Sequence, residues 1–542
     1  MNIGSIAKLS RYWHTIRYLK PVQTYGRLWF RLRRPVPDLR PAPAVRPAAD
    51  GWISCARRPS MLGATTFRFL SVTREATAAT DWNRPDWPKL WLYNLHYFDD
   101  LNADGAQEKT ELHRALMARW IAENPPAIGN GWEPYPLSLR MVNWVKWAAA
   151  GNGLDADAAH SLAVQARWLM ERLEWHLLGN HLLANAKALV FAGAFFAGPE
   201  ADVWRQKGLA ILRREHSEQI LDDGGHFERS PMYHAIILED LLDLIQLAQC
   251  WPGVIDAATV SGWRQSASPM LGWLGTMTHP DGEIAFFNDA AFGVAPNLAA
   301  LTAYAAGLGI VAGGLNSALH SGYLRVQRGD AVLIADVGEI GPDYLPGHAH
   351  ADTLSFELSV FGQRVVVNSG TSEYGLGAER LRQRGTAAHS TVQIDGADSS
   401  EVWSGFRVAR RARPVGFAAS EHADAVEVSC AHDGYRRLPG RPLHRRRWRM
   451  TAQGLRVTDA IEGGFRDAVA RYYLHPAVTV SAAGNDGLLT LLDGHIIRWS
   501  VAGGAARLVA ATWHPEFGRS IASTCIELVF SGPQVTMDFS WA

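Results

Sequence analysis

Two histidines and an aspartate alternate in GHAHADTLSFELSVFG, the stretch that starts at Gly347. His348, His350 and Asp352 share their parity with the apolar residues that follow, which are Leu354, Phe356, Leu358 and Val360. Since residues of one parity point to one face of a strand, this predicts a core-facing row that turns polar at its start. The opposite parity (Thr353, Ser355, Glu357, Ser359) predicts a half-solvated antiparallel sheet. The histidines could simply cap the strand, but three polar groups in register favour a site at the sheet edge.

Asn180 and His181 stand at a predicted helix start, in GNHLLANAKAL. Asn185 follows His181 by four positions and therefore shares its helix face. Asparagine is also a favourable N-cap, so capping explains Asn180 as well as a functional role does.

Tyr233 begins another predicted helix, in DDGGHFERSPMYHAIILEDLL. Ser230 fits its N-cap and Pro231 its first helical position. The positive helix end favours a phenolate, so we expect a lowered pKa for Tyr233, unless the ring is only a core residue. Glu228, just ahead, is a loop or cap carboxylate unless it pairs with another group.

Three residues on neighbouring predicted strands could hold a metal. Asn368 ends VVVN and His389 precedes STVQIDG, so adjacent strands can bring His350, Asn368 and His389 together. Zinc prefers His, Cys or carboxylate ligands to a neutral amide. We therefore expect zinc to be bound weakly or not at all.

The composition describes a soluble, globular chain of more than one domain. It has 542 residues, 47% of them hydrophobic and 20% charged. Lys+Arg and Asp+Glu are both 53, so no global charge indicates nucleic acid. No apolar run is long enough to span a membrane, and no signal peptide is recognisable, which leaves the compartment open. Clustered arginines, Arg380, Arg384, Arg407 and Arg410 among them, could bind carboxylate or sulfate or form a solvated strand face.

The pattern along the chain predicts an arm and two domains. Residues 1–60 are basic, aromatic and then Pro-rich, and are expected to form an arm with a short helix. Residues 61–306 are predicted to form an α/α toroid or solenoid, because helical spacing continues from about residue 110 to 306. Residues 307–542 open on a Gly-rich joint, 307–322, and then read as the short strands of an antiparallel β-sandwich. Eight helices are predicted, near 110–124, 137–150, 157–176, 182–197, 202–220, 232–250, 260–278 and 295–306.

The chain resembles the heparinase II/III family of polysaccharide lyases, together with related lyases of alginate and exopolysaccharides. The motifs that carry the resemblance are GNHLLANAKAL, GGHFERSPMYH, FNDAAFG, GHAHADTLSF, VVNSGTSEY and RGTAAHSTVQIDGADSSEVWSGFRVARRA. The resemblance implies an incomplete α/α toroid followed by an antiparallel β-sandwich. It places Asn180, His181, Tyr233 and His348 around the scissile bond. The structural metal position would map to His350, Asn368 and His389, although the family usually has aspartate at the second of these.

The reaction that the resemblance implies is β-elimination on a uronate. Asn180 and a histidine would neutralise the carboxylate, and Tyr233 would take the C-5 proton, protonate O-4, or do both. His181 or His348 would be the base when the proton leaves from the opposite face. Arg384, Arg407, Arg410 and Glu228 are the expected substrate contacts, with an acidic polysaccharide as partner.

Two alternatives stay open. A hydrolase on the same toroid needs two facing carboxylates, for which Glu228 and one of Asp222, Asp223 or Asp240 are candidates. A non-catalytic polysaccharide-binding factor of exopolysaccharide biosynthesis would keep the aromatic and arginine surface without needing Tyr233 beside Asn180. The sugar, the linkage, endo or exo action and the oligomeric state are not determined by the sequence.

Overall fold

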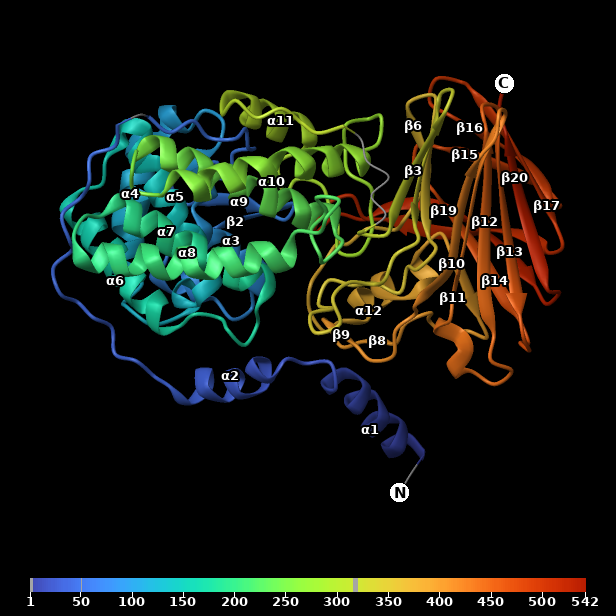
Figure 1. Ribbon diagram of the computed structural model, residues 1–542, viewed down its shortest axis with the longest axis horizontal. Coiled ribbons are helices and arrows are strands. Elements are labelled where there is room, and N and C mark those ends of the chain that lie inside the picture. The colour runs from blue at the N-terminus through green and yellow to red at the C-terminus, as the bar shows by residue number, and fades with distance from the viewer. Residues whose placement is uncertain (1–2, 50, 315–319) are drawn as a thin grey trace.

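A computed structural model describes residues 3–49, 51–314 and 320–542. It has a helical domain and a β domain side by side, with the N-terminal arm along one side of both (Figure 1). The arm contains two helices rather than one, α1 (Ile3–Ile16) and α2 (Pro21–Leu32), because Pro21 starts a new helix. Of the predicted joint at 307–322, residues 315–319 lie outside the described residues.

The helical domain contains all eight of the predicted helices. They are α4 (Thr110–Glu123), α5 (Pro134–Trp147), α6 (Ala156–Glu171), α7 (Gly179–Phe195), α8 (Pro199–Gln219), α9 (Pro231–Cys250), α10 (Ala257–Thr276) and α11 (Leu298–Gly307), preceded by the hairpin β1 (Thr66–Phe69) and β2 (Val72–Glu75) and by α3 (Lys89–Tyr97). Polar caps fix several starts: Asp155, Asp256 and Asn297 each accept a hydrogen bond from the backbone N–H three residues on.

Helix α7 lies at the centre of the helical domain, with nearly every residue buried. Glycines let α8 pack closely against it. A Cβ at Gly193 would lie 2.6 Å from the carbonyl oxygen of Ala201, and one at Gly208 would lie 2.6 Å from that of Ala186. This close packing holds α7 rigidly, and its first residues are those predicted to be functional.

The β domain consists of two antiparallel sheets packed face to face (Figure 1). One has the order β10-β11-β12-β13-β20-β17-β16-β15 and the other β18-β19-β14-β6-β5-β4-β3, with β7 paired to β14. Their strands are β3 (Tyr323–Arg328), β4 (Ala331–Asp336), β5 (Phe356–Val360), β6 (Gln363–Val367), β7 (Val392–Ile394), β10 (Pro414–Glu421), β11 (Ala425–His432), β12 (Leu443–Thr451), β13 (Gly454–Glu462), β14 (Ala468–Leu474), β15 (Thr479–Ala483), β16 (Asp486–Thr490), β17 (Ile496–Ala502), β18 (Ala505–Trp513), β19 (Ile521–Phe530) and β20 (Gln534–Ser540). A helix, α12 (Ala378–Arg384), and a small hairpin of β8 (Val402–Trp403) and β9 (Arg407–Val408) project toward the helical domain.

The predicted strand from His348 to Val360 is wrong in its first half. The strand β5 begins only at Phe356, and Leu354 has a left-handed backbone with φ 62°. Its second face is also buried rather than half-solvated, because the helical domain covers it. His279 bonds Glu357 at 2.9 Å and Ser359 at 2.7 Å, and Arg364 bonds Glu357 at 3.3 Å. The side chains from 348 to 352 are thus placed by an irregular segment at the seam between the domains.

Within the described residues, no helix is long and apolar enough to cross a membrane.

Candidate functional site

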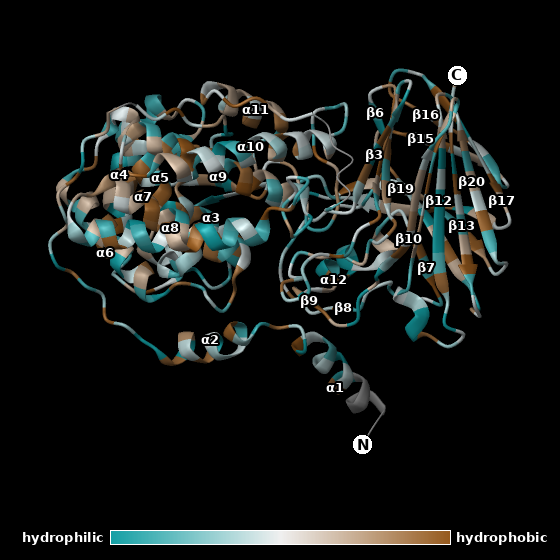
Figure 2. Ribbon diagram, viewed as in Figure 1, coloured by the Kyte–Doolittle hydropathy of each residue, from teal (hydrophilic) through white to brown (hydrophobic). Residues whose placement is uncertain are grey.

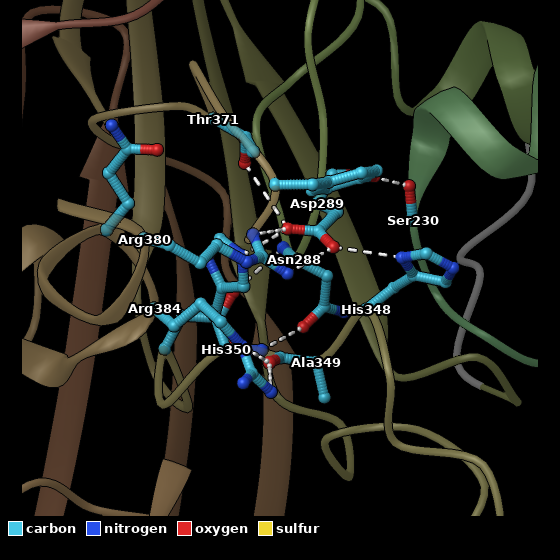
Figure 3. A network of polar contacts seen from close by, with 12 residues as sticks. Ser230, Asn288, Asp289, His348, Ala349, His350, Thr371, Arg380 and Arg384 are labelled. Carbon is cyan, nitrogen blue, oxygen red and sulfur yellow. Dashed lines mark hydrogen bonds and ion pairs between the residues drawn. The ribbon is translucent and has the colours of Figure 1, made fainter. Parts of the chain in front are cut away.

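The predicted residues converge at the seam between the two domains. Asn180 and His181 come from the start of α7, Glu228 and Tyr233 flank the start of α9, and His348 comes from the loop before β5. Figure 3 shows the polar network around His348 at this seam.

Left-handed backbone at non-glycine residues places three of these segments. Leu178 (φ 64°) precedes Asn180, Arg229 (φ 57°) follows Glu228, and Asn288 (φ 56°) precedes Asp289. Gly179 is required between Leu178 and Asn180, because a Cβ there would lie 2.3 Å from Cδ2 of Leu345 and 3.1 Å from Oε1 of Glu228. Such conformations are sterically costly and gather where a structure over-determines its backbone.

Asp289 is the centre of the network, and it was not among the predicted site residues. Its fully buried carboxylate accepts hydrogen bonds from His348 at 2.9 Å and His350 at 2.8 Å, and a bidentate pair from Arg380 (Figure 3). Burial raises the pKa of Asp289, but Arg380 and the histidines more than offset it and hold this pKa well below its usual range. The only sequence signal was the FNDAAFG motif, in which polar residues interrupt an apolar run.

His348 is oriented by this carboxylate. With Nδ1 bonded to Asp289, a neutral ring carries its proton on Nδ1 and leaves the Nε2 lone pair free. Nε2 lies 3.6 Å from Oε2 of Glu228. The ring packs against Tyr233, with 3.9 Å between the ring centroids. His348 can therefore accept a proton at Nε2 beside a phenol.

Tyr233 is a buried phenol, and our expectation of a lowered pKa is wrong. Its pKa is raised well above the usual value, first by burial and then by neighbouring Tyr374 and other acidic groups, which outweigh the helix end. Its hydroxyl lies 3.0 Å from that of Tyr374, and Ser230 caps the backbone N–H of Tyr233 at 3.1 Å, as predicted. A neutral phenol is suited to donate a proton.

Glu228 is buried, and neither of its carboxyl oxygens makes a side-chain hydrogen bond among the described residues; the backbone of Asn180 and Nε2 of His348 are its polar neighbours. Burial raises its pKa, and the nearby His348 only partly offsets this. Buried polar groups in folded proteins are normally paired, so an unpaired carboxyl at a seam is a group available to a ligand.

His181 belongs to the same wall of the seam. Its Nδ1 lies 3.2 Å from Oε1 of Glu174, and its ring packs on Tyr135 at 4.5 Å. Burial lowers the pKa of His181, but the Glu174 carboxylate outweighs burial and raises it overall. His181 is thus biased toward the cation, with Asn180 buried beside it.

The predicted metal residues are close together but do not fit a metal. Nδ1 of His350 and Nε2 of His389 lie 3.3 Å apart, whereas the amide of Asn368 is committed elsewhere: its nitrogen donates to the Phe286 carbonyl at 2.9 Å and its oxygen accepts from the Ser390 N–H at 3.1 Å. Across the described residues, no group of three His, Cys, Asp or Glu is arranged to hold an ion. Two nitrogens without a third ligand do not fit a zinc site.

The predicted arginines serve different purposes. Arg384 is fully buried and donates to backbone carbonyls, including that of Ala349 at 2.9 Å, so it holds the loop of His348 rather than facing the seam. Arg410 bonds Glu401 at 2.9 Å and the hydroxyl of Ser10 in the arm at 2.8 Å. Arg407 is exposed, and its guanidinium lies over Trp403.

The sequence matches two family models. Residues 156–304 match "Heparinase II/III N-terminus" and residues 311–542 match "Heparinase II/III-like, C-terminal". Among curated proteins, FtsZ-localized protein C of Caulobacter vibrioides is 30% identical over 447 residues, which is 75% of this chain and 73% of that protein. Heparin-sulfate lyase of Pedobacter heparinus is 28% identical over 314 residues, 51% of this chain and 46% of the lyase.

Solved structures share the fold. A crystal structure of heparinase III covers 88% of this chain and 79% of its own, with a TM-score of 0.66 and 17% identity. A heparan sulfate lyase from Pedobacter heparinus covers 96% of this chain and 87% of its own, with a TM-score of 0.57. The predicted fold class, a helical toroid followed by a β-sandwich, is confirmed.

Proposed function

The chain belongs to the heparinase II/III-like family, and from this premise we propose that it is a polysaccharide lyase that cleaves a uronate-containing polymer by β-elimination. The observation that carries the proposal is the buried carboxyl of Glu228, which has no side-chain hydrogen bond among the described residues and lies 3.6 Å from Nε2 of His348 at the seam. The positive-φ residues Leu178, Arg229 and Asn288 set the direction of the chain at Asn180, Glu228 and Asp289.

The proton transfers fall to His348 and Tyr233. His348 takes the C-5 proton at Nε2, the electrons of the C–H bond form the C4–C5 double bond, and the bond from C4 to its oxygen breaks. Tyr233 donates its phenolic proton to the leaving oxygen; its raised pKa keeps the phenol protonated until the oxygen leaves. The contact between the two rings, with 3.9 Å between their centroids, places the proposed base and acid next to each other.

The uronate carboxylate must be neutralised before C-5 becomes acidic. His181, whose pKa Glu174 raises, the amide of Asn180 and the carboxyl of Glu228 are the groups proposed to bind it. Burial raises the pKa of Glu228 and so favours its protonated form, in which the carboxyl would donate to the substrate carboxylate and stabilise the developing enolate. Arg407, the exposed member of the arginine set, is proposed to bind a neighbouring acidic sugar.

The experiment is a screen of acidic polysaccharides for an unsaturated product that absorbs near the ultraviolet edge. Uronate-containing polymers should give this product without added metal, and a neutral glucan should not. Turnover of a neutral glucan, or products formed by addition of water, would contradict the proposal.

A hydrolase is supported less well. It needs two carboxylates facing the sugar, and only Glu228 among the candidates lies beside His348. Asp223 bonds Ser321 at 2.7 Å, and Asp240 bonds Lys187 at 2.6 Å.

A binding protein without turnover is the second candidate, and one observation favours it. The hydroxyl of Tyr233 lies 3.0 Å from that of Tyr374. The proposed acid therefore already has a hydrogen-bond partner within the protein and must leave it to protonate a substrate. Saturable binding of a uronate polymer with no unsaturated product from any polymer would select this function.

A further inference from the structure

The two helices of the N-terminal arm expose apolar stripes of the same form. In α1 the stripe is Leu9, Tyr12, Trp13 and Ile16, and in α2 it is Tyr25, Leu28, Trp29 and Leu32. Both follow the spacing i, i+3, i+4, i+7, which places the four side chains on one helix face. These side chains are 36–65% exposed in α1 and 61–70% exposed in α2.

Both helices are attached to the body of the protein mainly by residues outside the stripes, although Tyr12 of the α1 stripe packs edge-on against Trp403 at 4.9 Å. In α1, Thr15 accepts a hydrogen bond from the indole of Trp403 at 3.1 Å, and Ser10 accepts one from Arg410 at 2.8 Å. In α2, Gln23 donates to the Tyr344 carbonyl at 3.0 Å, and Gly26 packs on His176. A cavity of about 600 Å³ lies between α2 and the helical domain, and Tyr25 and Trp29 border it. Helix α2 is therefore only partly packed against the helical domain.

The charged side chains at the start of the arm are all basic. Residues 1–37 contain eight Lys and Arg and no Asp or Glu, although the whole chain has equal numbers of each. Arg11 and Arg31, on the two helices, and Arg34, just after α2, are exposed. Figures 1 and 2 place both helices along the same side of the molecule, with brown, apolar positions among teal ones.

We propose that α1 and α2 bind flat to an anionic lipid bilayer. Exposed Trp and Tyr suit the boundary between headgroups and acyl chains, Leu and Ile reach the acyl region, and exposed Arg pairs with anionic headgroups. A partner protein could cover an apolar stripe, but residues 1–37 contain no acid. Lys20 and Arg33 pair with glutamates of the helical domain, and the exposed Arg11, Arg31 and Arg34 make the arm complementary to an anionic surface. The arm thereby holds both domains at a membrane surface without spanning it.

The test is co-sedimentation of the full chain with vesicles of phosphatidylcholine, with and without about 30% phosphatidylglycerol. We expect binding to the anionic vesicles only. Serine at Leu9, Trp13, Ile16, Leu28, Trp29 and Leu32 together should weaken binding at least about tenfold, because binding scales with buried apolar area. Glutamine at Arg11, Arg31 and Arg34 should weaken it roughly fivefold per charge.

The control is Leu492→Ser with Ile496→Ser, two exposed apolar residues of the β domain, which should bind as the unchanged protein does. Unchanged thermal unfolding shows that each variant is folded. Failure of the unchanged protein to bind anionic vesicles would overturn the proposal, as would equal binding by the serine variant. A concentration-dependent dimer, or binding to a soluble acidic polysaccharide, that the serine variant alone loses would assign the stripes to another occupant.

Discussion

His348 and His350 bind the two oxygens of one carboxylate, yet they belong to different environments. On the seam side of Asp289, His348 keeps Nε2 free beside the unpaired Glu228. On the interior side, His350 uses one ring nitrogen on Asp289 and the other on His389, and the amide of Asn368 is fully engaged. The seam side is organised for a ligand, whereas the interior side is organised to hold Asp289.

The types of residue do not distinguish the proposed functional side of Asp289 from its structural side. The two sides differ in where polar groups without a hydrogen-bond partner lie. Both sides are rich in histidine and buried carboxylate. Among the described residues both sides retain unused capacity: Nδ1 of His389 has no partner on the interior side, but its ring is buried there. On the seam side the carboxyl of Glu228 and Nε2 of His348 lie together, and these are the groups that we propose a uronate engages.

The largest expected effect is on stability, from Asp289→Ala. Removing this carboxylate leaves the buried guanidinium of Arg380 without its partner, which costs about 3–5 kcal/mol of unfolding free energy. Asp424→Ala, which breaks an exposed pair with Arg449, is the matched control and should cost about 1 kcal/mol or less. Denaturant unfolding measures both, and equal losses would remove Asp289 from the centre of the network.

The pair His348→Ala and His350→Ala separates the two sides directly. His348→Ala should lower turnover about a hundredfold or more with little change in melting temperature, because the ring lies at the seam. His350→Ala should lower the melting temperature, because its ring is fully buried and holds Asp289. The reverse pattern would place the chemistry on the interior side.

Glu174→Gln should change the pH dependence of substrate binding. The Glu174 carboxylate raises the pKa of His181, so the cation persists to higher pH than an ordinary histidine allows. Without this carboxylate the pKa falls, and KM should begin to rise at a lower pH than in the unchanged protein. Glu171→Gln, on an exposed pair with Arg33, is the control and should leave the profile unchanged. Identical profiles for all three proteins would exclude His181 as the carboxylate-binding cation.

The smallest effect is expected from metal. Protein purified without added zinc should contain well under one equivalent, and a chelator should leave its melting temperature unchanged. Asn368→Asp restores a charged oxygen and should raise the zinc content, at a cost of about 1–3 kcal/mol without zinc because Phe286 loses its donor. Stoichiometric, chelator-resistant zinc in the unchanged protein would contradict our conclusion that His350, Asn368 and His389 do not form a zinc site.

Much of the fold could be predicted from the sequence because its signals are local. Helical spacing and caps such as Ser230 act within a few residues, and all eight predicted helices of the toroid are present. The alternation after His348 was misleading, because β5 is buried on both faces and its polar residues bond to the helical domain. The alternation of polar and apolar residues does not show whether another domain covers the polar face of a strand.

The site was predictable only where a motif marks it. His348 and Glu228 do meet at the seam, but Asp289, Tyr374 and Glu174 join them through contacts between residues 7 to 141 positions apart. The pKa of Tyr233 was mispredicted for the same reason: burial by distant segments outweighs the nearby helix end.

The most direct test of the account is Tyr233→Phe, which removes only the hydroxyl. Turnover on an accepted uronate polymer should fall about a hundredfold or more, while the melting temperature and substrate binding are retained. Near-normal turnover per folded molecule together with a lower melting temperature would contradict the account, and would make Tyr233 a core residue.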